Sequence, residues 1–273
     1  MVDFDVIDGW EEELEKMNEG KVGEPYHYPD SFVQLLGYMR AYFHLPYRQT
    51  EGVVKGHARR KTVPSIPDYS TLCRRINKLD IRIKERIGND IIIALDSTGI
   101  KVANRGEWMR DKWHVRRGYL KIHVAVDIRK KKIVSLEVTS EEVHDSRVMK
   151  KLIDHASENN NVKRVIADGA YDSKKNFRYL HVNDIEAAIK VKKNSSGKAM
   201  GCYPRKIAVL QQLSDFGRWR RSVGYGHRWM AETVFSAMKR MFGEYVMARN
   251  YQSMVKEIYL KASLYNMFAG MKL

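Results

Sequence analysis

The stretch GYGHRWMAETVFSAMKRMFGE, from Gly224 to Glu244, predicts a helix with one apolar side and one charged side. Good helix formers begin at His227, Gly226 is a candidate N-cap, and Gly243 stands where a helix would end. Four residues fall on one side and are expected to face a core: Met230, Val234, Met238 and Met241. We treat this helix as the element around which the chain is organised.

The charged side of this helix is a narrow stripe. At about 100° per residue, Arg228, Glu232 and Lys239 fall within an arc of about 40°. Tyr225, just before the helix, is expected near the same stripe. Two interpretations compete: an ordinary surface ion pair of Arg228 with Glu232, worth about 0.3–0.5 kcal/mol, or part of a functional site.

Two further carboxylates favour the functional interpretation, because each is expected at the end of a buried strand. The run DIIIALD ends on Asp96 and the run VKRVIAD ends on Asp168. If these strands are parallel neighbours, the two carboxylates lie side by side, and they need a cation between them to stay ionised. All-oxygen ligands suit Mg²⁺ or Mn²⁺, and two such ions stabilise the attacking and leaving oxygens in phosphoryl transfer.

The segments around these strands predict a mixed α/β sheet. Residues 118–128 and 131–140 alternate in polarity and would form a three-stranded meander with the strand that begins at Asp90. A polar loop, 101–117, separates the first two strands. Helices and strands then alternate in the order β-β-β-α-β-α-β-α, which a simple Rossmann repeat does not produce. A basic insertion is expected at about 192–223.

The N-terminal third predicts a small helical domain. Helices are expected at 31–45, with Ser31 as N-cap, at about 47–54, and at 70–79, with Asp68 or Ser70 as cap. The last helix carries Arg74, Arg75 and Lys78 away from its apolar side, as in a helix-turn-helix module that binds DNA. Any small helical bundle shares this pattern. Residues 1–30 are acidic and are interpreted as a tail or linker.

The charge balance indicates a polyanionic partner. The chain has 49 Lys and Arg against 33 Asp and Glu, a net charge of +16. Because residues 1–30 hold ten acidic and two basic residues, the remainder carries +24, which favours nucleic acid over a membrane surface. No stretch approaches the length of a membrane span, and Cys73 and Cys202 lack metal-ligand spacing. We therefore expect a cytoplasmic protein without a disulfide.

The spacing Tyr225-(two)-Arg228-(three)-Glu232-(six)-Lys239 resembles the signature of insertion-sequence DDE transposases. Three further stretches look like the insertion sequence five group of that family: IALDSTGI around Asp96, VIADGAYDS around Asp168, and PDYSTLCRR from Pro67 to Arg75. The resemblance covers about residues 31–268 and shows no departure at the signature positions.

The resemblance implies a ribonuclease-H-like catalytic domain at 90–273, preceded by the helical DNA-binding domain at 31–89. Asp96, Asp168 and Glu232 would bind two Mg²⁺ or Mn²⁺ ions, and the other signature residues would contact DNA near the cut. Such an enzyme binds terminal inverted repeats, nicks the 3′ ends and joins them to target DNA. We expect a homodimer in the DNA complex of a prokaryotic, nucleoid-associated protein. The alternatives are a metal-dependent nuclease that does not join DNA, and a non-catalytic DNA-binding protein.

Three other positions have competing interpretations. Asp172 is expected to cap a helix beginning at Ser173. The pair His144-Asp145 begins another helix, capped by Asp145 or Ser146, and would lie on the catalytic side as a supporting group. Trp219, within GRWRR, would either stack on a DNA base or belong to the core.

Overall fold

A computed structural model describes residues 4–60, 63–102, 119–198 and 201–271 of the chain, without the side chains of 4, 5 and 119. The chain divides into two compact units. The first comprises Met1–Ile81 and Ala248–Leu264, and the second comprises Arg82–Met247 and Tyr265–Leu273. Most of the predicted loop 101–117 lies outside the described residues.

The first unit is helical. Its elements are η1 (Phe4–Ile7), α1 (Trp10–Asn18), α2 (Asp30–Phe43), α3 (Tyr47–Arg59), α4 (Tyr69–Lys78) and the first part of α11 (Tyr251–Gly270). Asp68 caps α4 as predicted, accepting hydrogen bonds from the backbone N–H groups of Ser70 and Thr71. Pro29 occupies the N-cap position of α2, so the prediction of Ser31 as that cap is wrong.

The acidic N-terminal segment is part of this unit, which contradicts its interpretation as a tail or linker. Trp10 is 4% exposed, and its ring lies 4.8 Å from that of Phe32 on α2. Ser31, the expected cap, instead donates a backbone hydrogen bond of 2.9 Å to Glu13 on α1. Burying a tryptophan ring stabilises the unit by about 2–3 kcal/mol. The packing of Trp10 therefore holds α1 on the unit although the surface of α1 is acidic.

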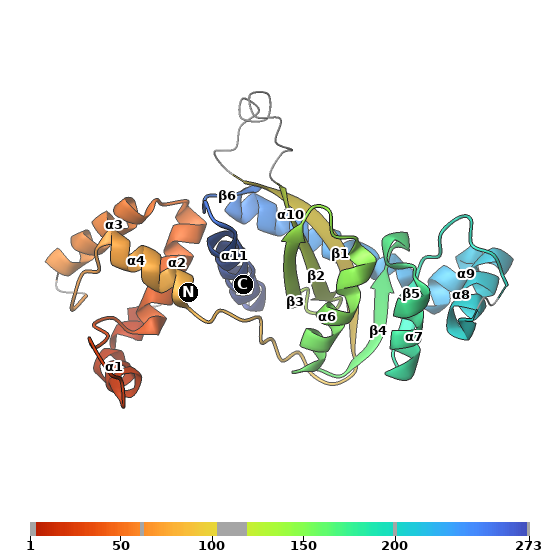
Figure 1. Cartoon of the computed structure of the whole chain (residues 1–273), viewed down its shortest axis with the longest axis horizontal. Coiled ribbons are helices and arrows are strands. Elements are labelled where there is room, and N and C mark those ends of the chain that lie inside the picture. Colours follow the sequence, from red (N-terminus) through yellow and green to blue (C-terminus); the bar gives the residue numbers. More distant parts are fainter. Residues whose placement is uncertain (1–3, 61–62, 103–118, 199–200, 272–273) are drawn as a thin grey trace, which may run out of the picture. The chain divides into compact units, whose positions relative to one another are not determined.

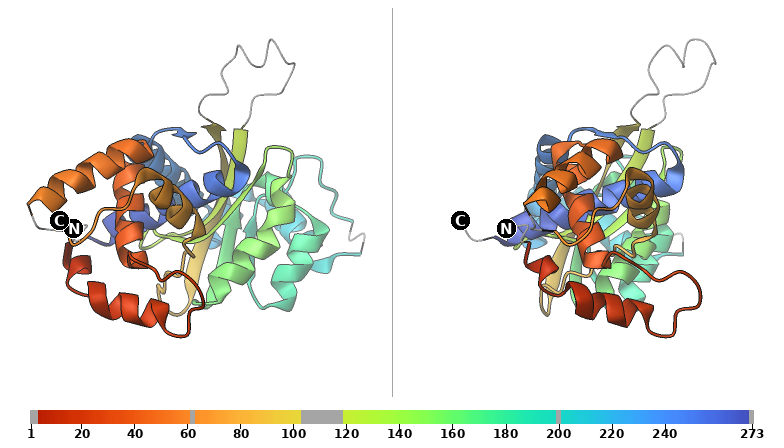
Figure 2. Two further views of the ribbon diagram at one scale, coloured as in Figure 1. Left: turned by 60° about the vertical axis from the view of Figure 1, so that its left-hand side comes forward. Right: turned by 90° about the vertical axis from the view of Figure 1, so that its left-hand side faces the viewer.

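The second unit contains a six-stranded mixed sheet (Figures 1 and 2). Its strands are β1 (Ile91–Val102), β2 (Tyr119–Asp127), β3 (Ile133–Ser140), β4 (Val162–Ala167), β5 (Glu186–Ile189) and β6 (Tyr245–Val246). The order is β3-β2-β1-β4-β5, with β6 paired to β1. The first three strands form the predicted antiparallel meander, and β4 and β5 continue the sheet in parallel with β1.

Helices cover both faces of this sheet. On one face, the buried residues of α6 (Asp145–Ser157) and α7 (Lys174–Val182) pack against alternate residues of β1 and β4, including Ile93 and Val165. On the other face, Ile92 and Ile166 belong to a cluster with Trp219 of α9 (Phe216–Ser222). α10 (Trp229–Phe242) also contacts β1 and β2 (Figure 1). Successive residues of one strand therefore face different helices.

β1 does not end at Asp96, which corrects the sequence-based boundary. It continues to Val102 because β2 pairs along it from Ile93 to Lys101, and β6 pairs with its last two residues. Parallel pairing with β4, however, is recorded only up to Ala94. Asp96 therefore lies where β1 loses its parallel neighbour rather than where the strand stops.

The basic insertion after β5 is more helical than predicted. It contains α8 (Tyr203–Ser214) and α9, which Asp215 caps. The 3-10 turn η3 (Tyr225–Arg228) leads from α9 into α10. Both cysteines are free. Among the described residues, no helix has the length and apolar character needed to cross a bilayer.

Candidate functional site

Asp96 and Asp168 lie side by side at the carboxyl ends of the paired parts of β1 and β4. Ala94 pairs with Ile166, so the same register places Asp96 beside Asp168 two residues later. Both carboxylates share the strand face of Ile166, because side chains alternate along a strand. The predicted juxtaposition on neighbouring parallel strands therefore agrees with the sheet register.

Backbone donors hold both carboxylates. Asp96 Oδ1 accepts a 2.9 Å hydrogen bond from the N–H of Ser97, and Asp168 Oδ1 accepts one of 2.9 Å from the N–H of Ala170. The second bond caps the short 3-10 turn η2 (Gly169–Tyr171). Each aspartate thus keeps oxygen lone pairs for a further ligand.

Arg228, the first residue of the charged stripe, connects the stripe with Asp96. One guanidinium nitrogen of Arg228 lies 3.8 Å from Asp96 Oδ2, and another donates a hydrogen bond to Glu232. Arg228 therefore bridges a carboxylate of β1 and a carboxylate of α10. Lys239 lies two helical turns after Glu232 on α10. A purely local ion pair on a solvated helix would not explain the approach to Asp96.

The start and the apolar face of α10 differ from the prediction. Gly226 is not the N-cap, because the chain takes a 3-10 turn from Tyr225 and the helix begins at Trp229. Gly243, at φ 73°, does end it. Met241 is 37% exposed and Met230 is half-buried. Val234 and Met238 are buried as predicted, and Ala231, Phe235 and Phe242 complete the buried face.

Burial dominates the electrostatics of Asp96. Burial raises the pKa of Asp96 to about 6, and the charges of Asp168 and Glu232 act in the same direction. The N–H of Ser97 and the charge of Arg228 oppose that rise. A cation bound to Asp96 would lower this raised pKa and stabilise the charged form of the carboxylate. Oxygen-only donors of this kind fit Mg²⁺ or Mn²⁺.

The three carboxylates are not drawn together into a metal-binding group. Among the described residues, no three His, Cys, Asp or Glu side chains form a group that could hold a metal ion as they stand. The Arg228 guanidinium contacts both Asp96 and Glu232. A metal ion would compete with this arginine for the same oxygens.

Aromatic packing fixes the chain that leads into α10. The Trp219 ring lies 5.4 Å from Phe216 and 5.2 Å from Tyr225. Trp219 is only 4% exposed, so the interpretation as a base-stacking residue is contradicted, and it is a core residue. Tyr225 is half-buried, and burial raises its pKa, with Arg228 lowering it and Asp168 raising it. Tyr225 therefore lies near the carboxylates, as expected.

Asp145 supports the site from the opposite face of the sheet. His144, not Asp145 or Ser146, is the N-cap of α6. Asp145 lies 2.6 Å from Lys121 Nζ and 3.3 Å from His123 Nδ1, and it accepts a hydrogen bond from Ser97. Burial raises the pKa of Asp145, but these hydrogen bonds outweigh burial and hold it well below its usual range. Ser97 thus links the Asp145 network to the strand position next to Asp96.

Sequence reasoning missed Lys121 and His123. The signal was the alternation KIH on β2, which places both residues on the face that carries Ala125 and packs against α6. His123 is fully buried, and its other ring nitrogen lies 3.0 Å from the hydroxyl of Thr139. A buried histidine and a lysine on one face indicate a carboxylate opposite them.

Asp172 is not a helix cap. Ser173 caps α7, whereas the fully buried Asp172 side chain accepts two hydrogen bonds from Arg205, of 2.6 and 2.7 Å. Burial raises the pKa of Asp172, but Arg205 outweighs burial and lowers it. An N-cap side chain accepts a hydrogen bond from a backbone N–H of the first helical turn, whereas this side chain binds an arginine 33 residues away.

The three basic residues of α4 have different environments. Arg75 is occupied within the first unit, donating hydrogen bonds of 2.8 Å to Asp30 and to the carbonyl of Tyr28. Its side chain is only 12% exposed. Arg74 and Lys78 are exposed. Of the three predicted DNA contacts, the structure therefore leaves Arg74 and Lys78 accessible, and the position of Arg75 is explained by packing.

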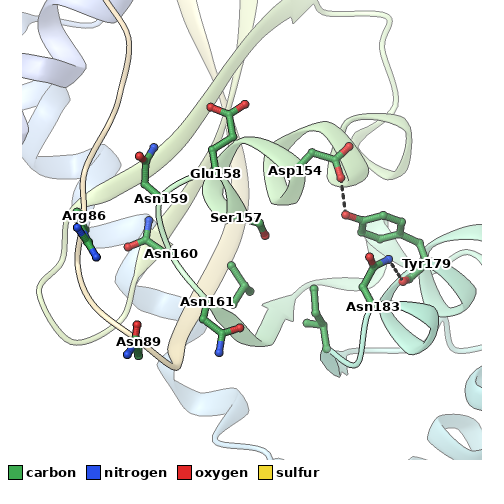
Figure 3. A pocket seen from close by; sticks show the side chains of 12 residues that line it. Arg86, Asn89, Asp154, Ser157, Glu158, Asn159, Asn160, Asn161, Tyr179 and Asn183 are labelled. Atoms are coloured by element: carbon green, nitrogen blue, oxygen red, sulfur yellow. Dashed lines mark hydrogen bonds between the residues drawn. The ribbon is translucent and has the colours of Figure 1, made fainter.

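A polar pocket of about 850 Å³ is lined by none of the three predicted catalytic carboxylates (Figure 3). Its lining includes Asn89, Asn161 and Asn183, and Asp154 accepts a 2.6 Å hydrogen bond from the hydroxyl of Tyr179. Asn89 precedes β1, and Val162 of the lining begins β4, so the pocket lies at the amino ends of these strands. The candidate site lies at their other ends.

Comparisons with known proteins match this chain to a family. A family model described as the transposase DDE domain matches residues 88–267, and a second model of the same description matches residues 1–105. The first match includes all three predicted catalytic carboxylates.

Similar solved structures are distant. The piggyBac transposase synaptic complex with hairpin DNA has 9% identity and a TM-score of 0.45, over 97% of this chain and 72% of that one. The Mos1 transposase catalytic domain has 13% identity and a TM-score of 0.26, over 67% and 85%. A simian T-cell lymphotropic virus intasome has 11% identity and a TM-score of 0.28, over 68% of this chain. The chain spans 62% of that last protein.

Proposed function

We propose that this chain, which belongs to the transposase DDE domain family, binds the terminal inverted repeats of a mobile element and catalyses DNA strand cleavage and strand transfer. The observation that carries the proposal is the register that sets Asp96 beside Asp168, with Arg228 joining Asp96 to Glu232. The Tyr225-Arg228-Glu232-Lys239 spacing supports membership of the insertion sequence five group. The sheet order β3-β2-β1-β4-β5 supports a ribonuclease-H-like domain.

Asp96, Asp168 and Glu232 would hold Mg²⁺ or Mn²⁺, and a bound pair of ions would supply charge stabilisation at the attacking and leaving oxygens of a phosphodiester. Asp96 and Asp168 are anchored by backbone donors, so their oxygens stay aimed at one place. Glu232, on α10, is paired with Arg228 in this structure and would complete the metal site from the helix. The side chains thereby position the reacting phosphate, which is how enzymes accelerate phosphoryl transfer.

The cationic residues of the charged stripe, Arg228 and Lys239, would bind DNA phosphates. Arg228, which contacts Asp96 and Glu232 in this structure, would bind a phosphate next to the cut when those carboxylates hold a metal ion. Lys239, on the same stripe, would bind a phosphate further along the strand. Tyr225 would contact the DNA at the start of the stripe. These contacts would hold the scissile bond in line with the carboxylates.

The first unit would provide end recognition. Arg74 and Lys78 are exposed on α4 of a helical bundle, an arrangement that suits a helix-turn-helix contact with DNA. Two chains would act together as a homodimer, one for each end of the element, and the protein would work at the nucleoid of a prokaryotic cell. Membership of the family and the basic body of the chain support DNA as the partner.

The test uses the full chain with DNA that carries the inverted repeats flanking its gene. Asp96→Ala, Asp168→Ala and Glu232→Ala should each abolish cleavage in Mg²⁺ and leave binding of the ends nearly unchanged. The matched control, Asp184→Asn, replaces an exposed aspartate just before β5 and should cleave normally. A carboxylate variant that cleaves at nearly the wild-type rate would remove that residue from the site. Cleavage without joining to a target plasmid would identify a nuclease.

A further inference from the structure

The row of functional positions at the carboxyl edge of the sheet continues onto β5. Ala167 pairs with Ile189 in parallel, and the N–H of Lys190 donates a 3.2 Å hydrogen bond to the carbonyl of Ala167. The register that places Asp168 one residue after Ala167 therefore places Lys190 beside it. Neighbouring strands lie about 4.8 Å apart, so a lysine backbone stands next to a predicted catalytic carboxylate.

The side chain of Lys190 lies on the catalytic face. Ala188 belongs to the cluster with Trp219, whereas Ile189 belongs to the cluster with α6 and α7, so Lys190 returns to the face of Trp219. Its Nζ lies 5.8 Å from the centre of the Phe216 ring. The residue is nevertheless exposed. Lys190 thus presents a cation on the same face as Asp96 and Asp168.

The segment that follows Lys190 is held by buried polar groups. The N–H of Lys192 donates a 3.0 Å hydrogen bond to Asp172, which Arg205 also binds. Arg205 donates a further bond of 2.8 Å to the hydroxyl of Ser195. Gln212, 8% exposed, accepts from the N–H of Val191 at 3.0 Å. The surface segment after Lys190 is therefore held at three residues, Val191, Lys192 and Ser195.

This fixation is informative because buried polar groups contribute to it, beside the apolar packing of Val191 against the cluster of α6 and α7. Burying an aspartate such as Asp172 carries a desolvation cost, and a buried ion pair is seldom more stabilising than apolar residues of the same volume. What Asp172 and Arg205 provide is a defined backbone position for the exposed Lys192 and Lys193. Lysines on a merely solvated surface would not need one.

We propose that Lys190, Lys192 and Lys193, here called the lysine ledge, bind the phosphates of the DNA strand that lies next to the scissile bond on the β5 side. Asp172 and Arg205 act as positioning residues that hold this ledge. The ledge rests on the proposed function and adds contacts outside the Tyr-Arg-Glu-Lys spacing. DNA that approaches three carboxylates is repelled, and cations on the flank of that row reduce the repulsion where the strand must enter.

The binding experiment uses the full chain and a 30-base-pair DNA duplex, labelled for fluorescence anisotropy and titrated at several salt concentrations. Lys190→Gln should weaken binding and make the logarithmic salt slope shallower by about 0.9, the value for one lost phosphate contact. The triple Gln variant of the ledge should reduce the slope by up to about three times as much. The matched control is Lys163→Gln, an exposed β4 lysine near the amino end of the sheet, which should leave the slope unchanged. Equal slopes for Lys190→Gln and Lys163→Gln would overturn the ledge.

The positioning role is tested by a double-mutant cycle. Asp172→Asn should weaken DNA binding in the wild-type background and have little further effect in the triple ledge variant, because the residue acts through the lysines. An equal loss in both backgrounds would show a general structural effect and refute positioning. Lys190→Gln should also slow cleavage in Mg²⁺. If the wild type binds DNA but never cleaves it in Mg²⁺ or Mn²⁺, the proposed function fails, while the slopes still decide the ledge.

Discussion

Replacing Asp96 by Asn should make the protein more stable at neutral pH while removing cleavage. The pKa of Asp96 rises from 3.8 to about 6, mainly through burial. Each pKa unit corresponds to about 1.4 kcal/mol, so the full cost of keeping this carboxylate charged is about 3 kcal/mol. The side chain is 19% exposed, so screening by water reduces the measured value to about 1–3 kcal/mol.

The sign of the pH dependence follows from proton binding. Below pH 3.8 Asp96 is protonated in the folded and unfolded chain alike. Between 3.8 and about 6 the folded chain keeps a proton that the unfolded chain has lost, so the stability of the wild type falls as pH rises. Above about 6 the full cost is present. The amide of the Asp96→Asn variant cannot ionise, so the variant's advantage in free energy of unfolding should grow from pH 4 to pH 7 and then level off.

The assay is urea unfolding of both proteins at pH 4, 5, 6, 7 and 8, in EDTA, because a bound divalent cation would offset the cost. Asp184→Asn is the matched control for loss of an exposed carboxylate, at a positive φ of 55° that asparagine also tolerates. An Asp96→Asn protein that is less stable than the wild type at pH 7 would refute the reasoning. The reasoning would also be refuted if the difference in free energy of unfolding from the wild type changed with pH in the same way for Asp96→Asn and Asp184→Asn.

Other changes separate the roles of the neighbouring residues. In Mg²⁺ at one hundred times its Kd, the wild type should gain about 2.7 kcal/mol in urea unfolding, and Asp96→Asn should gain far less. Asp145→Asn should cost about 3 kcal/mol at pH 7 because Lys121 loses its partner, and the loss should shrink as pH falls through the titration of the carboxylate, since its folded pKa is lowered. Trp219→Ala should cost about 3–5 kcal/mol, whereas a folded Trp219→Phe should bind DNA normally. Arg228→Gln combined with Lys239→Gln should leave end binding intact and remove most cleavage; normal cleavage would return the stripe to an ordinary charged surface.

Much of the candidate site at the carboxyl edge of the sheet could be predicted from the sequence because its signals are local. The apolar run before Asp96 and the run before Asp168 are strand patterns, and parallel pairing brings their ends together. The Arg228–Glu232 pair follows from helical spacing. The start of α10 was misplaced because Gly224, at φ 65°, sets up a 3-10 turn that helix propensity does not reveal.

The groups that hold the edge in place escaped prediction because their partners are distant in sequence. Asp172 next to Ser173 has the pattern of a helix cap, yet its partner is Arg205. Asp145 likewise begins a helix, but it faces a lysine and a histidine of β2. For Asp172 a local rule explained the aspartate, and for Asp145 the sequence predicted a supporting position but not the partners that it binds. The strand register could have distinguished a local cap from a distant partner. With β2 paired to β1, Lys121 and His123 lie on one face of the sheet, and two such groups indicate a carboxylate opposite them. Asp145 of α6 is that carboxylate.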